Sequence, residues 1–379
     1  MPSFCAAVGC SSSSDKDICK ENKVSFHGFP LKNEKLLREW MMKMRSESVT
    51  SKAVADNDSQ QDKEVQTDSD VVAYLLEQLS LKDQQISLLQ SKLFSLKKVK
   101  LNKNAFLSIT GFTVETFDIV FEFLNLDLVN RGLTPEEQFF MFLVRVRCGC
   151  TLDFLCEQFC LTKSSVSRML SAVIDSVYTK VKDIDIWLSK KQVQEFMPEA
   201  FALKYPNCRA ILDCTEFAIQ IPSNPRVQQL TFSYYKNRNT VKALIAITPS
   251  EALSYISDLW CGKISDKQLF SESGLLQHIQ NDDILADRGF LIAAELAAKN
   301  CRLIMPHFLK QKIQFTVTER NQNQQVSNLR VHVERAISRI KKYQYFRGPI
   351  PRQCFGEVNK VFYILAFFTN FSNPLIKIE

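Results

Sequence analysis

The chain has 379 residues, of which 45% are hydrophobic and 11% aromatic, so it can bury a core in two or three domains. No run of about 18 apolar residues occurs, and residues 1–20 lack the features of a secretory signal, which excludes a membrane protein and predicts an intracellular one. The net charge of +7 is compatible with nucleic acid as a partner but does not require it.

The amino-terminal 70 residues divide into two segments by composition. Residues 1–45 contain three cysteines, one histidine and a tryptophan, as a small compact module would. Residues 46–70 contain no aromatic residue and more acidic than basic side chains, so they cannot support a core. We therefore expect a flexible linker over 46–70.

An apolar repeat follows in residues 71–98. Apolar residues recur in alternating steps of three and four, interrupted at Lys82, at Val72, Leu75, Leu79, Ile86, Leu89, Leu93 and Leu96. This heptad seam predicts a short coiled coil and hence a homo-oligomer, the alternative being an amphipathic helix packed on its own domain. The following "KKVKLNK", residues 97–103, resembles a nuclear localisation signal and predicts a nuclear protein.

Residues 133–182 have the pattern of a helix-turn-helix. Thr134, Pro135 and Glu137 form a helix start with a capping box, and two more helices are expected on either side of residues 161–162. The last helix opens with short polar and basic side chains suited to phosphates and base edges: Lys163, Ser164, Ser165 and Arg168. We expect DNA binding here, the alternative being a helical hairpin with a polar face.

Residues 208–371 alternate strand-like and helical runs, which predicts a mixed α/β domain. Asp213 and Asp287 each end a strand-like run, and Glu334 lies in a basic helix beside a buried stripe marked by Val333 and Ile340. Three such carboxylates can converge on two divalent cations, for which oxygen ligands favour magnesium or manganese. The alternative for Glu334 is a charge-balanced helix surface.

The same helix is rich in basic residues that could meet DNA phosphates while Glu334 faces inward. These residues are Arg330, Arg335, Arg339, Lys341 and Lys342. A site that holds magnesium or manganese on the three acids and DNA phosphates on the basic helix would suit cleavage of DNA.

Four stretches in order resemble the Harbinger and PIF transposases: "LDCTEFAIQIP", "SYYKNRNTVKALIAITPSEALSYISDLWCGKISDKQL", "DDILADRGF" and "LRVHVERAISRIKK". The resemblance implies an RNase H-like DDE core in which Asp213, Asp287 and Glu334 are the catalytic acids and metal ligands. It also implies the preceding helix-turn-helix and a separate Myb-like partner. Asp266 in "GKISDK" fits the family pattern too, and we interpret it as a helix cap or loop residue, with a role near the metals as the alternative.

The amino terminus resembles a THAP zinc finger in "MPSFCAAVGC", "VSFHGFP" and "LLREWMMKMR". Only Cys5 and Cys10 match the ligand pattern, because no later Cys and His two residues apart follow Trp40. A four-ligand site cannot be completed as that family builds it, unless Cys19 and His27 substitute. We therefore expect a truncated, degenerate zinc-finger remnant.

The expected fold is α/β, with an RNase H-like DDE core preceded by a helix-turn-helix, a coiled coil and the zinc-finger remnant. The expected function is that of a transposase-derived DNA endonuclease that uses divalent metal ions, with strand transfer as an extension of the reaction. The alternatives are a domesticated DNA-binding protein that keeps the fold without catalysis, and a coiled-coil interaction protein.

Overall fold

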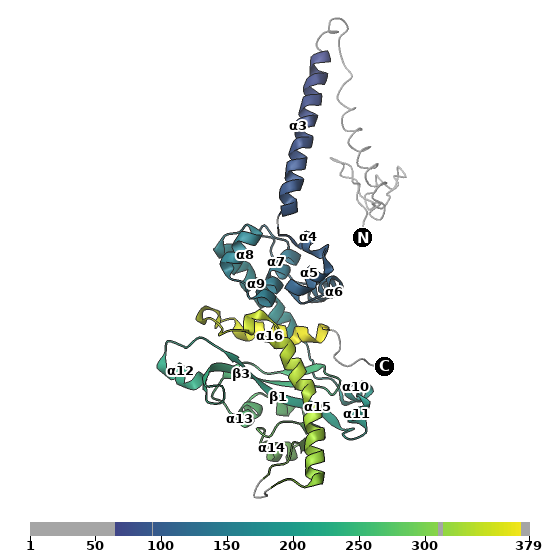
Figure 1. Ribbon diagram of the computed structural model, residues 1–379, viewed down its shortest axis with the longest axis vertical. Coiled ribbons are helices and arrows are strands. Elements are labelled where there is room, and N and C mark those ends of the chain that lie inside the picture. Colours follow the sequence, from purple (N-terminus) through teal and green to yellow (C-terminus); the bar gives the residue numbers. More distant parts are fainter. Residues whose placement is uncertain (1–64, 93, 310–313, 373–379) are drawn as a thin grey trace, which may run out of the picture. The chain divides into compact units, whose positions relative to one another are not determined.

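The computed structural model describes residues 65–92, 94–309 and 314–372 (Figure 1). The chain divides into two compact units, residues 1–85 and residues 86–379. The zinc-finger remnant and most of the predicted linker lie outside the described residues. Within the described ranges, no helix is both long enough and apolar enough to span a membrane.

One long helix, α3 (Val65–Lys92), contains most of the predicted coiled coil. It begins before the apolar repeat, so residues 65–70 are helical and the predicted linker is too long at this end. Polar residues extend a helix readily once it is nucleated, so the polar composition of residues 65–70 did not exclude a helix there. The seam residues Val72, Leu75 and Leu79 are exposed.

The predicted coiled coil is also too long at its carboxyl end. Ser95 caps a separate short helix, α4 (Leu96–Lys100), by accepting a hydrogen bond from the Lys98 backbone N–H. Leu96 is buried in the core of the second unit. The last apolar position of the repeat therefore serves intramolecular packing.

A helical module opens the second unit. Its remaining helices are α5 (Lys103–Thr110), α6 (Val114–Leu124), α7 (Pro135–Cys148), α8 (Leu152–Phe159) and α9 (Lys163–Lys182). The predicted start of α7 is confirmed, because Thr134 and Glu137 form a capping box with Pro135 in the first turn. Phenylalanines dominate the interior, as in the stacked pair Phe106 and Phe140.

A mixed sheet follows the helical module and two short helices, α10 (Lys190–Glu195) and α11 (Glu199–Ala202). Its strands are β1 (Cys208–Ala218), β2 (Phe232–Ser233), β3 (Arg238–Ile247), β4 (Leu253–Ile256), β5 (Trp260–Cys261), β6 (Asp283–Leu285) and β7 (Arg302–Ile304). The main order is β2-β3-β1-β6-β7, and β4 and β5 also pair with β3. Strand β1 is antiparallel to β3 and parallel to β6, which is parallel to β7.

Helices cover both faces of the sheet (Figure 1). Ile211 and Phe217 of β1 belong to the core that includes α15 (Val317–Lys341) and α16 (Val358–Phe368). Leu212 belongs to the opposite core, with α13 (Asp266–Glu272) and α14 (Ala293–Ala297). Helix α16 also packs on α9, so one apolar core joins the helical module to the sheet.

Candidate active site

The edge of β1 opens where the parallel strand β6 ends. The pairing of β1 with β6 reaches Ile211 opposite Leu285, whereas the pairing with β3 continues to Ala218 opposite Thr240. Asp213 lies just beyond Ile211, on this open edge. The prediction that Asp213 ends its strand is therefore wrong, because β3 pairs with β1 on both sides of it and holds the acid inside a continuing strand.

Asp213 is half-buried, and its carboxylate accepts a hydrogen bond of 2.9 Å from the backbone N–H of Cys214. Burial raises the pKa of Asp213 to about 6, against the opposing effect of the Arg330 charge. The negative charges of Asp287 and Asp266 raise it further. The structure therefore brings Asp287 and Asp266 into the electrostatic surroundings of Asp213.

Asp287 lies where the sequence predicted, two residues after β6. Its Oδ1 accepts a hydrogen bond of 2.7 Å from the backbone N–H of Arg288, and its backbone carbonyl accepts one of 3.0 Å from Phe290 N–H. These bonds form a turn directly after the strand and hold the carboxylate within it. The side chain is partly exposed, as a residue that meets a substrate must be.

Arg330 of α15 lies between Asp287 and the third predicted acid. Its Nη1 is 3.1 Å from Asp287 Oδ1, and its Nη2 is 3.9 Å from Glu334 Oε1. The Arg330 side chain is only 14% exposed, whereas that of Glu334 is 57% exposed. Arg330 was predicted to meet DNA phosphates, and in the structure described its guanidinium faces the acids, so that role stays a prediction.

The three predicted acids do not close around one point. Among the described residues, no three His, Cys, Asp or Glu side chains are placed to hold a metal ion. The donors nevertheless suit a divalent cation in kind, since carboxylate oxygens are the ligands that magnesium and manganese prefer. They suit it in charge as well, because neighbouring acids raise the pKa of Asp213 and a cation would relieve that repulsion.

A second charged cluster lies on the other face of β1 and β3. Lys242 Nζ is 2.7 Å from Asp266 Oδ1 and 3.7 Å from Glu216 Oε1, and all three side chains are largely buried. Thr240 donates a hydrogen bond of 2.9 Å to the other oxygen of Glu216. Lys242 and Glu216 were not predicted as site residues, although opposite charges inside two apolar strand runs were a usable signal.

Asp266 belongs to this cluster and not to a helix cap. Ser265 caps α13, with its hydroxyl accepting a hydrogen bond of 3.1 Å from Gln268 N–H, and Asp266 is the first helical residue. A Cβ atom added to Gly289 would lie 2.6 Å from Asp266 Oδ2. Asp266 therefore approaches the turn that carries Asp287, and only glycine leaves room for it there. The cap interpretation is wrong.

The remaining basic residues of α15 have different surroundings. Arg335 Nη1 is 3.9 Å from the buried Glu251 Oε1, which is also 2.5 Å from His332 Nδ1. Burial lowers the pKa of Arg339. Lys341 Nζ lies 5.8 Å from the centre of the Phe217 ring, and Lys342 is exposed. The buried stripe of Val333 and Ile340 is confirmed.

The first turn of α9 holds the residues predicted to read DNA. Lys163 Nζ is 2.8 Å from Asp153 Oδ1 of α8, and both side chains are exposed. Arg168 Nε donates a hydrogen bond of 3.1 Å to the Ser164 carbonyl, and the Ser165 hydroxyl is 2.9 Å from that of Thr162. Thr162 also caps the helix. The polar groups at this helix start are therefore exposed but locally ordered.

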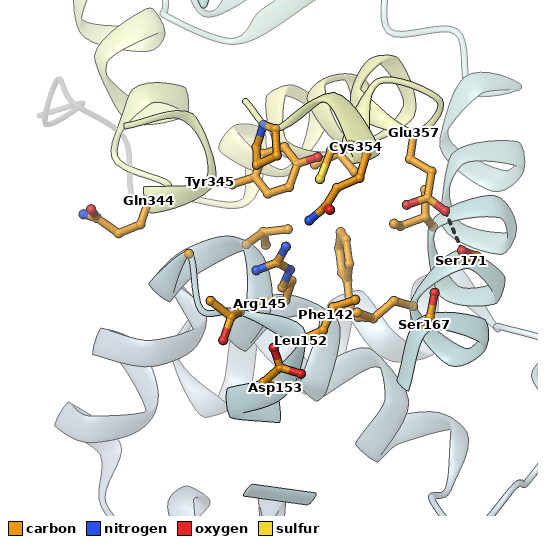
Figure 2. A pocket seen from close by; sticks show the side chains of 18 of the residues that line it. Phe142, Arg145, Leu152, Asp153, Ser167, Ser171, Gln344, Tyr345, Cys354 and Glu357 are labelled. Atoms are coloured by element: carbon orange, nitrogen blue, oxygen red, sulfur yellow. Dashed lines mark hydrogen bonds between the residues drawn. The ribbon is translucent and has the colours of Figure 1, made fainter. Parts of the chain in front are cut away.

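A pocket of about 700 Å³ lies between the helical module and the segment that follows α15 (Figure 2). Tyr345 and Cys354 line one wall, and Phe142 and Leu152 line the other. At its side, Ser171 Oγ donates a hydrogen bond of 2.5 Å to Glu357 Oε1. This pocket adjoins the contact between the helix-turn-helix and the sheet domain, and it contains none of the predicted acids.

Comparison with protein families gave three matches. Residues 212–370 match the DDE superfamily endonuclease, and residues 131–183 match the helix-turn-helix of that endonuclease. Residues 5–63 match the THAP domain, a match that extends past the predicted remnant and lies outside the described residues. Comparison with curated proteins and with solved structures gave no match. Together the three matches are those of a DDE transposase with an amino-terminal THAP domain.

Proposed function

We propose that the chain is a transposase-derived DNA endonuclease whose reaction takes place at the open edge of β1. The observation that carries the proposal is the approach of Asp287 to the half-buried Asp213 at the point where β6 ends. The strand order also supports an RNase H-like core, since the first strand is central, an antiparallel strand flanks it on one side and parallel strands on the other.

In this proposal Asp213 and Asp287 hold divalent cations, magnesium or manganese. The bound cations would activate the attacking oxygen and stabilise the leaving oxygen in phosphodiester cleavage. Glu334 is the third acid, and it joins the others when Arg330 releases it. Arg330 then neutralises the acids in the metal-free chain and is free to meet a phosphate when cations replace it.

DNA would be bound by two surfaces. The start of α9 offers Lys163, Ser164, Ser165 and Arg168 for sequence recognition, as the helix-turn-helix match supports. The last turns of α15 offer Arg335, Arg339, Lys341 and Lys342 for the phosphate backbone. We also propose a nuclear location, which the THAP and helix-turn-helix matches favour.

Self-association through α3 is part of the proposal. The exposed Val72, Leu75 and Leu79 lie at heptad spacing, and a second copy of the chain would bury them. Two copies would bring two DNA ends together. A Myb-like partner would supply further DNA recognition, as the resemblance to Harbinger elements implies.

A nicking assay on supercoiled plasmid tests the proposal. The full chain should nick the plasmid when magnesium or manganese is added, and the Asp287→Asn variant should not. Asp127→Asn is the matched control, because Asp127 is exposed on the helical module and outside the site. If parent and Asp287→Asn bind DNA equally and neither nicks it, the chain is a DNA-binding protein without catalysis and the endonuclease proposal is wrong.

A further inference from the structure

The segment that connects β1 to β3, residues 219–240, is basic and carries exposed aromatic rings. It contains Arg226, Lys236 and Arg238 and not one acidic residue. It folds into α12 (Pro225–Thr231), β2 and the turn that leads into β3. A surface that combines positive charge with aromatic rings is the composition that single-stranded nucleic acid requires.

Tyr234 and Tyr235 form the tip of the turn and are the most exposed aromatic residues of the segment. Tyr234 is 77% exposed and Tyr235 is 84% exposed. The Tyr234 ring meets Phe232 edge-on at 5.4 Å, and Lys236 Nζ lies 4.4 Å from the centre of the Tyr235 ring. The rings are thus available to a ligand while a cation already lies beside one of them.

The turn is held in shape by its own hydrogen bonds. Lys236 N–H donates to Ser233 Oγ at 3.3 Å, and Arg238 Nε donates to the Lys236 carbonyl at 3.3 Å. Asn239 anchors α12 by donating 2.8 Å and 2.7 Å hydrogen bonds to Thr231 Oγ1 and the Gln228 carbonyl. The exposed tyrosines are therefore presented by an ordered support, which lowers the entropy cost of binding.

The turn is continuous with the basic end of α15. Phe217 pairs with Val241 of β3, and Lys341 lies over the Phe217 ring. Partial burial, and then the charge of Lys236, lower the pKa of Lys341, which places the turn near that ammonium group. Arg238 begins β3 about seven positions from Ile245, the partner of Asp213, or roughly 23 Å along the strand. One DNA strand covers that distance in about seven nucleotides.

We propose that Tyr234 and Tyr235 bind unpaired bases of a DNA strand by stacking, about seven nucleotides from the phosphate that is cleaved. Lys236 and Arg238 would hold the adjacent phosphates. This inference rests on the proposed function, because it takes the ligand to be the DNA that enters the site. It adds a binding site for a single-stranded region next to a duplex.

The test uses the full chain without divalent metal, so that binding is measured apart from cleavage. The probes are a duplex with a single-stranded tail that carries 2-aminopurine at successive positions, and the same sequence fully paired. For the parent we expect quenching at one or two adjacent positions in the tail. The double variant Tyr234→Ala, Tyr235→Ala should lose this quenching and bind the tailed DNA about tenfold or more weakly, with the paired DNA unaffected.

Two control proteins separate stacking from other causes. Tyr234→Phe with Tyr235→Phe keeps the rings and should behave as the parent. Phe196→Ala removes an exposed ring at the end of α10 and should change nothing. Unchanged quenching in the double Ala variant overturns the inference, as does equal weakening for both DNAs or a change in sedimenting mass. A parent that binds neither DNA overturns the proposed function itself.

Discussion

Asp213 and Glu334 are held in the protein by different means. Asp213 lies in a strand whose register is set by pairing with β3, and its side chain is half-buried. Glu334 lies on the surface of α15, where its exposed carboxylate is 3.9 Å from Arg330 Nη2. The comparison teaches that the sheet half of the site is fixed by backbone hydrogen bonds, whereas the helix half depends on one ion pair that can rearrange.

Helix α15 as a whole is nevertheless anchored from its other side. His332 contacts the carboxylate of Glu251, which is 3% exposed and follows β3 in a left-handed backbone conformation. Because His332 and Glu334 point in different directions around the helix, this anchor fixes the backbone without fixing the acid. Movement at Glu334 is therefore expected to be a side-chain movement.

The largest expected effect is on strand cleavage. Asp213→Asn, Asp287→Asn and Glu334→Gln each remove one charge while nearly preserving shape, so each should slow nicking by about a hundredfold or more without loss of DNA binding. Plasmid nicking and filter binding measure the two properties. If Glu334→Gln nicks at the parent's rate, Glu334 is not the third acid. Of the two residues compared, only Asp213 on the sheet then belongs to the site.

The sequence indicated the acids but not the arrangement around them. Asp213, Asp287 and Glu334 were found from charges that follow or flank apolar runs. That reasoning could not show that β1 continues past Asp213, because the continuation depends on pairing with β3, which extends to Ala218 although the pairing with the short β6 ends at Ile211. The pairing of distant strands decides this, and no local pattern records it.

The surroundings of the acids were harder still to predict. Arg330 and Glu334 are four residues apart, a spacing that brings side chains together on one face of a helix, and they lie 3.9 Å apart. The spacing could not tell that the guanidinium would reach Asp287, which comes from another element. Lys242 and Glu216 were missed because each is a single charged residue within an apolar run, and their meeting across β1 and β3 depends on the strand pairing.

A second prediction concerns stability and pH. The unfolded chain loses the Asp213 proton near pH 4, whereas the folded chain holds it to about pH 6. Between these pH values the folded state binds more protons than the unfolded state, so the free energy of unfolding falls as pH rises. The whole loss of stability from the ionised Asp213 is present above pH 6. The cost is on the order of 3 kcal/mol. Urea unfolding should show Asp213→Asn more stable than the parent at pH 7 and nearly equal to it at pH 3.5.

The same experiment sharpens the comparison, because Glu334 is exposed. Glu334→Gln should not reproduce the gain in stability at pH 7. An equal gain in both variants would show that the two acids share one buried environment, which would contradict the distinction drawn between them.

A third prediction tests Arg330 as the counter-ion of the site. Arg330→Gln removes the cation beside Asp287, and the metal-free chain should lose about 1–2 kcal/mol of unfolding free energy because the acids then repel one another. Added manganese should restore more stability to this variant than it adds to the parent. Thermal unfolding with and without manganese measures both effects. If manganese stabilises the parent and Arg330→Gln by the same amount, Arg330 does not compete with a cation.

The smallest expected effect separates the two residues of α15 that approach Glu251. Arg335 is half exposed and 3.9 Å from the carboxylate, so Arg335→Ala should cost less than about 1 kcal/mol. His332→Ala should cost more, about 1–3 kcal/mol, because it leaves a buried carboxylate without its hydrogen-bond donor. Urea unfolding of both variants at pH 7 gives the two values. If Arg335→Ala costs more than His332→Ala, the ion pair of Arg335 with Glu251 anchors α15, and the hydrogen bond of His332 with Glu251 does not. The helix would then be held less firmly than the sheet.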